Sequence, residues 1–288
     1  MNSEKTDPDT TGMLTLVATP IGNRGDISLR AIETLKEAEI ILCEDTRHTR
    51  PLIVAHGVNP KKLKRYDDHS DDRKRNEILS RLREGAQIAL VSDAGLPLIS
   101  DPGYKLVRDC RKKGLSITAV PGANAALTAL QLSGLPSDSF SFGGFLPNKS
   151  TARQKALKAW AESPGTLIFY EAKQRIAASL HDAAEILGNR AAAVCRELTK
   201  QYEEVVTGSL PELAAYYRDK GEVKGEFVLV IAPPEKKELS EEDLETFLRE
   251  KLAEGLRPKD AAAAAAAELG APKTKAYNLA IQVKKEQE

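Results

Sequence analysis

Residues 92–103 read SDAGLPLISDPG, a stretch of twelve residues that holds two glycines, two prolines and two aspartates. It follows the apolar run 87–92, whose length and composition predict a buried strand. Glycine lets a ligand approach the backbone closely, and proline fixes the path of the chain. These residues therefore predict a rigid loop at the carboxyl end of a strand, where open α/β sheets bind ligands.

Strands and helices alternate on both sides of this loop. Apolar runs predict further strands over 13–18, 40–43, 63–66 and 116–120. Helices are predicted between them, several closed by a glycine, over 28–37, 46–57, 72–83, 104–113 and 123–133. This alternation predicts a mostly parallel sheet covered by helices.

A second α/β region is predicted after the turn sequence SGLPSD, residues 133–138. Its strands are expected over 139–143, 166–170, 192–196, 201–207 and 226–231. Its helices are expected over 150–162, 174–187 and 209–219. We expect some antiparallel pairing in this region.

The last segment has a different character. Pro233-Pro234 and the charged run after them indicate a linker, and Ser240 with Asp243 resembles a capping box that opens a helix. Two more short helices follow, and the group resembles a helix-turn-helix with exposed lysines, although a small packing domain explains the same pattern. The chain is thus divided into a disordered leader at 1–12, an N-terminal α/β domain at 13–135, a C-terminal α/β domain at 136–234 and a helical extension at 239–288.

Composition excludes several classes of protein. Lys and Arg number 42 and Asp and Glu number 42, so a chain that coats nucleic acid through bulk positive charge is excluded, while a local basic patch is not. The polar leader contains no apolar core, which excludes a signal peptide. No apolar run approaches the length needed to span a membrane. The three cysteines lie far apart, which suits a reducing cytoplasm and offers no zinc site.

Other loops also follow predicted strands. TPIGN (19–23), EDTR (44–47) and PGANAA (121–126) fall at the same edge of the expected sheet as 92–103. The usual nucleotide and hydrolase signatures are missing, since the sequence has no G-x-G-x-x-G after the first strand, no P-loop, no H-E-x-x-H and no G-x-S-x-G.

Eight motifs together resemble one family. They are VATPIGN (17–23), EDTR (44–47), SDAGLPLISDPG (92–103), PGANAAL (121–127), SGLPSDSFSFGGFLP (133–147), TLIFYEA (166–172), RELTKQYEE (196–204) and GEFVLV (225–230). In this order they resemble the 16S ribosomal RNA (cytidine-2′-O)-methyltransferases, which have the tetrapyrrole methylase fold. Two positions depart from the pattern: Leu96 stands where the family usually has Thr, and Lys173-Gln174 replaces Pro-His before Arg175.

The resemblance implies an α/β protein of two domains, of the class III S-adenosylmethionine methyltransferases, with a helical extension. It implies that S-adenosylmethionine lies in a cleft between these domains, without a metal. The residues expected around it are Pro20, Ile21, Gly22, Asp93, Gly95, Leu96, Ser100, Ala123, Asn124 and Ala125. It further implies a homodimer, and as substrate a cytidine ribose of 16S ribosomal RNA in the decoding region of the small subunit.

Methyl transfer to a ribose hydroxyl needs alignment and gains from a positioned base. The candidates for handling the hydroxyl are Glu44, Asp45, Arg47, Tyr170, Glu171, Arg196, Glu197 and Lys200. Arg47 and Lys200 suit phosphate binding equally well, and Arg196 with Glu197 suits a structural ion pair. The sequence does not single out the base.

RNA binding has one visible electrostatic aid. Residues 47–75 carry nine Lys or Arg against four Asp, and such a run neutralises phosphates or simply forms a solvated face. Two other functions stay open: a small-molecule tetrapyrrole methyltransferase, which the same fold supports, and an RNA-binding protein without catalysis.

Overall fold

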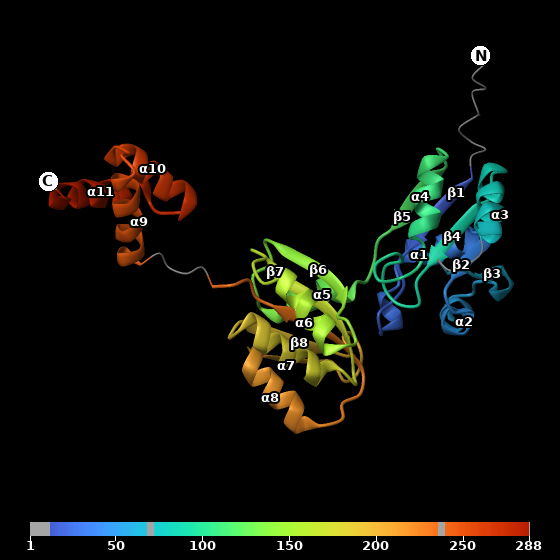
Figure 1. Ribbon diagram of the computed structural model, residues 1–288. Coiled ribbons are helices and arrows are strands. Elements are labelled where there is room, and N and C mark those ends of the chain that lie inside the picture. Colours follow the sequence, from blue (N-terminus) through green and yellow to red (C-terminus); the bar gives the residue numbers. More distant parts are fainter. Residues whose placement is uncertain (1–11, 68–71, 236–239, 288) are drawn as a thin grey trace, which may run out of the picture. The chain divides into compact units, whose positions relative to one another are not determined.

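The computed structural model describes residues 12–67, 72–235 and 240–287, so the expected leader lies outside the described residues except for Gly12. The chain forms two units, Met1–Pro234 and Glu235–Glu288, each with its own hydrophobic core. The first unit contains two five-stranded sheets and the second contains helices (Figure 1). This architecture confirms the predicted fold class.

The first sheet is entirely parallel and follows the order β3-β2-β4-β1-β5. Its strands are β1 (Met13–Val17), β2 (Ile40–Cys43), β3 (Leu63–Arg65), β4 (Gln87–Val91) and β5 (Ser116–Val120). Its helices are α1 (Leu29–Glu37), α2 (Thr46–Ala55), α3 (Asp72–Arg83) and α4 (Tyr104–Lys112), with short 3-10 turns η2 (Arg24–Asp26) and η3 (Pro60–Lys62).

Helices cover both faces of this sheet, because alternate residues of a strand point to opposite sides. Ile41 and Ala89 pack in one cluster with residues of α1 and α2. Leu42 and Leu90 pack in another cluster with residues of α3 and α4. The central strands of the sheet are therefore buried on both sides, and its carboxyl edge is left for the loops.

The second sheet is mixed and follows the order β6-β7-β10-β8-β9. Its strands are β6 (Phe140–Phe145), β7 (Thr166–Ala172), β8 (Ala191–Arg196), β9 (Glu204–Ser209) and β10 (Glu226–Ile231). β6 runs parallel to β7, and the other pairs are antiparallel. The expected antiparallel pairing is thus confirmed.

One face of this sheet is covered by α6 (Ser150–Ala159), α7 (Ile176–Leu187) and α8 (Leu210–Lys220). The other face is covered by α5 (Ala125–Ser133), whose Ala126, Ala129 and Leu130 pack against the sheet. The sequence places this helix in the N-terminal α/β domain, yet its apolar side joins the core of the second sheet. Ile21, from the loop after β1, belongs to the same cluster.

The strand predicted over 201–207 begins only at Glu204, so the first part of that prediction is wrong. A turn precedes it, because Thr199 has a left-handed backbone with φ of 65°. The Glu203 carboxylate accepts the backbone N–H of Thr199 at 2.7 Å, and this closes the turn. Local hydrogen bonding of this kind competes with strand pairing.

The second unit consists of α9 (Glu241–Ala253), α10 (Pro258–Glu268) and α11 (Lys273–Gln287). Ser240 caps α9 by accepting the backbone N–H of Asp243. Three residues of the alanine run, Ala261, Ala262 and Ala265, are buried in its core, which allows the helices to approach closely. In the part of the chain that the structure describes, no helix is long and apolar enough to cross a membrane.

Candidate active site

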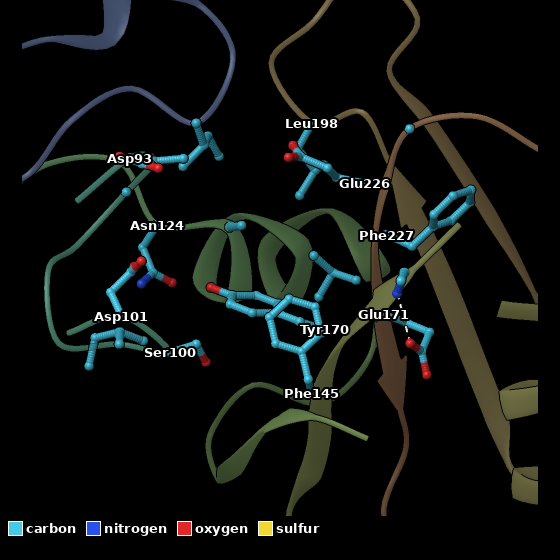
Figure 2. A pocket seen from close by; sticks show the side chains of 18 of the residues that line it. Asp93, Ser100, Asp101, Asn124, Phe145, Tyr170, Glu171, Leu198, Glu226 and Phe227 are labelled. Atoms are coloured by element: carbon cyan, nitrogen blue, oxygen red, sulfur yellow. Dashed lines mark hydrogen bonds between the residues drawn. The ribbon is translucent and has the colours of Figure 1, made fainter. Parts of the chain in front are cut away.

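A cavity of about 460 Å³ opens at the carboxyl edge of the first sheet, between loop 92–103, the start of α5 and strands β7 and β10 of the second sheet (Figure 2). Its volume falls in the range of small-molecule sites. Its wall is mostly apolar, with four carboxylates and two carboxamides. The lining residues are Ile21, Asp93, Ala94, Gly95, Leu96, Ile99, Ser100, Asp101, Asn124, Ala125, Phe145, Tyr170, Glu171, Ala172, Lys173, Gln174, Leu198, Gly225, Glu226, Phe227 and Val228.

Loop 92–103 is tied to the loop after β1 by its backbone. Thr19 N–H donates to the Gly95 carbonyl at 2.9 Å, and Gly95 N–H donates to the Thr19 carbonyl at 3.0 Å. Four of its residues have left-handed backbones: Gly95, Leu98, Ser100 and Gly103. For leucine and serine this conformation is strained, and such strain gathers at functional sites. The structure thus has a loop with an unusual backbone path at the carboxyl end of β4, where the sequence predicts one.

Asp101 lies in this loop with its carboxylate at the cavity. The hydroxyl of Ser92 is 2.7 Å from Asp101 Oδ2. Burial raises the pKa of Asp101 to about 6, and the nearby carboxylates Glu44 and Asp93 add to the rise, while the Ser92 hydrogen bond opposes it. This carboxyl group is therefore far more basic than an ordinary aspartate.

Tyr170 and Asn124 form the adjoining wall. The Asn124 side chain accepts the Leu127 N–H at 2.9 Å and caps α5. The Tyr170 ring packs edge-on against Phe142 and Phe145, with centroids 4.8 and 5.5 Å away. Burial raises the pKa of Tyr170, and its hydroxyl points toward the side of the cavity that holds Asp101 and Asn124 (Figure 2).

The loop after β8 approaches the cavity through Leu198, which is buried. On either side of it, Glu197 and Lys200 form an ion pair at 2.9 Å, and Lys200 also binds Glu226 at 2.8 Å. The Glu197 carboxylate accepts the Glu226 N–H as well. This pairing lowers the pKa of Glu197 and raises that of Lys200 against the opposing effect of burial, so the two groups hold the loop shape.

The EDTR loop lies outside the cavity lining. Asp45 caps α2 by accepting the Arg47 N–H, and its carboxylate binds the Arg47 guanidinium at 2.6 Å. These hydrogen bonds hold the pKa of Asp45 well below its usual range. The Arg47 side chain is 86% exposed. The Asp45 N–H donates to Asp93 Oδ1 at 3.2 Å, so the loop touches a cavity residue through its backbone.

The structure brings most of the predicted cofactor residues together. Seven of the ten line the cavity: Ile21, Asp93, Gly95, Leu96, Ser100, Asn124 and Ala125. Three do not: Pro20, Gly22 and Ala123. Of the candidates for handling the hydroxyl, Tyr170 and Glu171 line it, whereas Glu44, Asp45, Arg47, Arg196, Glu197 and Lys200 do not.

Several lining residues were not singled out from the sequence, among them Asp101 and Phe145. Asp101 is the second aspartate of the 92–103 motif, so the sequence contained a signal for it. Phe145 lies beyond a β-bulge that follows Phe142, which no sequence pattern indicated. Leu96, Lys173 and Gln174, the residues that depart from the family pattern, all line the cavity.

One set of potential metal ligands occurs among the described residues: His181, Asp182 and Glu185 on α7. None of them lines the cavity. The Asp182 carboxylate is bound by the Arg153 guanidinium at 2.6 Å, with both side chains buried, and this indicates a structural ion pair.

Known proteins match this chain along most of its length. A protein named ribosomal RNA small subunit methyltransferase I from Halalkalibacterium halodurans is 45% identical over 94% of this chain and 95% of its own length. A protein of the same name from Escherichia coli O157:H7 is 44% identical over 98% of this chain and 99% of its own length.

Solved structures share the fold at low sequence identity. A cobalt precorrin-4 methyltransferase of cobalamin biosynthesis superposes with a TM-score of 0.58 at 14% identity, over 80% of this chain and 98% of the other. A uroporphyrin-III C-methyltransferase from Thermus thermophilus, complexed with S-adenosylhomocysteine, gives 0.52 at 20% identity, over 77% and 97%.

The model of one protein family, the tetrapyrrole (corrin/porphyrin) methylases, matches residues 13–214. That range covers the first sheet and the second sheet except β10, and it ends in the middle of α8. It includes loop 92–103 and the start of α5, which line the cavity. The resemblance read from the eight motifs is confirmed by this match and by relatives of 44–45% identity. The chain therefore belongs to the tetrapyrrole (corrin/porphyrin) methylase family and is a methyltransferase.

Proposed function

We propose that this protein transfers a methyl group from S-adenosylmethionine to the 2′-hydroxyl of a cytidine in 16S ribosomal RNA, in the decoding region of the small subunit. The observation that carries the proposal is the identity of 44–45% to proteins named ribosomal RNA small subunit methyltransferase I, over 94–98% of this chain. The cavity supplies the site. The alternative is a methyltransferase that acts on a small-molecule tetrapyrrole, and the experiment must distinguish the two substrates.

The cavity residues fit the methyl donor. Ile21, Leu96 and Leu198 form apolar wall suited to a flat adenine, and Ala94, Gly95 and Ala125 leave room beside the backbone. Asp93, Ser100 and Asn124 offer polar groups for the sugar and the amino acid portion. When bound, S-adenosylmethionine supplies a methyl group that its sulfonium centre has already activated.

The protein contributes alignment and a dry environment. The strained backbone of loop 92–103 fixes the direction of its N–H and carbonyl groups before a ligand arrives, which avoids an ordering cost on binding. Leu198 and the aromatic pair Tyr170 and Phe145 screen the cavity from water on the side of the second sheet. The proposal requires no metal at this site.

RNA would be held outside the cavity, by exposed basic side chains. Arg47 and Lys61 are exposed on the first unit, and Lys259, Lys273 and Lys275 are exposed on the second. Such groups neutralise phosphates and position the RNA without reading its sequence. We further propose a cytoplasmic homodimer; sedimentation at micromolar concentration should give twice the 31.3 kDa of one chain, and a monomer would contradict this.

The test uses small ribosomal subunits from a strain that lacks this protein. The purified enzyme, treated with chelator, is incubated with labelled S-adenosylmethionine and either the subunits or a porphyrinoid. We expect label in the ribosomal RNA, and mass spectrometry of the digested RNA should place it in 2′-O-methylcytidine. Label in the porphyrinoid alone, or a different methylated nucleoside, would contradict the proposal.

A further inference from the structure

Phe145 lies at the rim of the cavity and is the most exposed phenylalanine among the described residues, at 56%. Ile21 and Leu198, which also line the cavity, are only 8% and 6% exposed. The Phe145 ring meets the Tyr170 ring at a centroid distance of 5.5 Å (Figure 2). A single exposed apolar side chain is ordinary on a protein surface. The backbone, however, is distorted to place this one at the cavity.

A β-bulge in β6 turns Phe145 toward the cavity. Phe142 pairs with Ile168 and Phe145 pairs with Tyr170, so three steps along β6 match two steps along β7. Because side chains alternate between the faces of a strand, a regular β6 would point residue 145 at the face covered by α6, α7 and α8. The extra residue returns Phe145 to the face of Phe142 and Tyr170. Bulges of this kind re-aim side chains next to active sites.

Two glycines make the bulge possible. Gly144 has a left-handed backbone with φ of 65°, a conformation that costs other residues free energy. A Cβ on Gly143 would collide with the ring of Phe169, which is buried in the core of the second sheet. A Cβ on Gly144 would lie 3.4 Å from Ser100 Oγ, so the end of β6 meets the loop after β4 here. A regular strand would direct residue 145 toward the helices, so the sheet gives up an apolar contact to keep an exposed ring at the cavity.

The charges of the cavity restrict what can lie against this ring. Four carboxylates line the cavity, and the one cation in the lining is Lys173, which directly follows β7. Lys173 is exposed and has no hydrogen-bond or ion-pair partner among the described residues. The carboxylates repel a phosphate from the interior, and Lys173 attracts one. An RNA strand is therefore expected to keep its phosphates outside and to present its uncharged ribose and base to the cavity.

We propose that Phe145 is the platform on which the base of the target nucleotide stacks, and this rests on the proposed function. The base is attached to C1′, next to the carbon that bears the 2′-hydroxyl, so it enters the site together with the reacting group. A base that leaves its stack in RNA loses its neighbours, and an aromatic ring replaces them. Phe145 thereby positions the ribose at the methyl donor. Every base has such a face, so Phe145 holds the base without selecting cytidine.

The decisive variant is Phe145→Ala, which removes the ring. We expect kcat/KM for small subunits to fall about 5- to 150-fold, the range expected for the loss of one stacked base. The loss should lie in kcat, because KM for the subunit depends on phosphate contacts elsewhere. The Kd of S-adenosylhomocysteine should not change. Phe145→Trp keeps a flat face and should retain the rate, whereas Phe145→Leu keeps apolar bulk alone and should behave like Phe145→Ala.

The matched control is Phe140→Ala. Phe140 is 44% exposed, belongs to the same strand and does not line the cavity, so this variant should keep full activity. A second readout does not use activity. Phe145→p-benzoylphenylalanine is irradiated with small subunits from the strain that lacks this protein, in the presence of S-adenosylhomocysteine. Primer extension should place the cross-link at the nucleotide that the wild type methylates, and the same probe at position 140 should not reach it.

The possible results separate two failures. If the wild type methylates ribosomal RNA and either Phe145→Ala or Phe145→Leu keeps its rate, Phe145 is not a base platform and the proposed function stands. Weaker binding of S-adenosylhomocysteine would assign the ring to the donor, and conversion of a dimer into a monomer would assign it to a subunit interface; each overturns the proposal, as does a cross-link confined to other nucleotides. If the wild type leaves the RNA unmodified, the proposed function fails and the platform falls with it.

Discussion

Gly22 is the residue at which the loop after β1 meets the loop after β8. A Cβ at this position would lie 2.5 Å from Lys200 Cγ, 2.8 Å from Thr199 Oγ1 and 2.9 Å from the Leu198 carbonyl oxygen. The Asn23 N–H donates to Thr199 Oγ1 at 3.0 Å, so the two loops are bonded as well as packed. Gly22 itself does not line the cavity, yet it decides how closely Leu198 approaches it.

The variant Gly22→Ala should therefore push these loops apart. We expect it to be less stable by about 1–3 kcal/mol, the usual cost of overpacking, and to bind S-adenosylhomocysteine at least tenfold more weakly. Calorimetry and thermal unfolding measure both effects. Gly25→Ala is the control, because its Cβ would meet only the Asn23 side chain, at 3.3 Å. Equal affinity in the two variants would contradict the role given to Gly22.

Single residues also show where sequence reasoning reached its limit. Asp93 and Asp101 stand in the same loop, and the family resemblance led to Asp93 alone. Which carboxylate is buried depends on left-handed turns at Leu98 and Ser100, and composition does not reveal them. Similarly, Glu197 and Lys200 were candidates for chemistry, but pairing with each other and with Glu226 gives them a structural role that only the fold shows.

Among the elements, α6 and α7 are joined by a buried ion pair. Asp182 on α7 accepts hydrogen bonds from Arg153, Ser150 and Gln154, all at the start of α6. Removing the acid alone strands a buried guanidinium. Asp182→Ala should cost about 3–5 kcal/mol of unfolding free energy, measured by urea denaturation. The double variant Arg153→Met/Asp182→Leu removes both charges and should recover most of the loss; if it is as unstable as Asp182→Ala, the charge explanation fails.

Element positions were the most predictable feature. Strands such as Ile40–Cys43 and Ser116–Val120 are confirmed to the residue, because short runs rich in apolar and β-branched residues, bounded by turn residues, mark strands clearly. The partner of a helix was less predictable. α5 follows the first sheet in sequence but packs on the second. Its apolar residues predict that it is buried, but they do not indicate against which of the two sheets.

Residues 47–75, the basic run that contains η3 and β3, are the segment expected to bind phosphate. Lys61 and Lys64 are exposed, whereas the Lys62 ammonium donates to the Lys36 carbonyl at 2.6 Å and supports the end of α1. Part of the basic run, residues 68–71, lies outside the described residues. The replacement that spares the fold is therefore Lys61→Ala/Lys64→Ala.

This double variant should weaken RNA binding and reduce the slope of log K against log salt by about 2, one for each phosphate contact. Its affinity for S-adenosylhomocysteine should not change. Lys155→Ala/Lys158→Ala is the control, because it removes the same charge from exposed positions elsewhere, on α6. If both pairs reduce the slope equally, binding follows net charge and no local patch.

At the scale of the whole molecule, the two units have separate cores. The cluster of Leu244, Leu248 and the buried alanines contains residues of the second unit alone. A chain ending at Glu235 should therefore unfold cooperatively at the same temperature as the first unit of the full chain, and bind S-adenosylhomocysteine with unchanged affinity. We expect its affinity for small subunits to fall at least tenfold. Unchanged RNA affinity would show that the helical unit only packs, the alternative that the sequence left open.

The strand order of the second sheet determines when this sheet can form during translation. β10 is the last strand in the chain and lies in the middle of its sheet, between β7 and β8. Until β10 has been synthesised, β7 and β8 lack the strand that pairs with both of them. The cavity then also lacks the wall that Gly225–Val228 supplies. The first sheet can form early, since its strands end at Val120. The cavity that we propose for the methyl donor is thus completed only in the last fifth of translation, as a single late event.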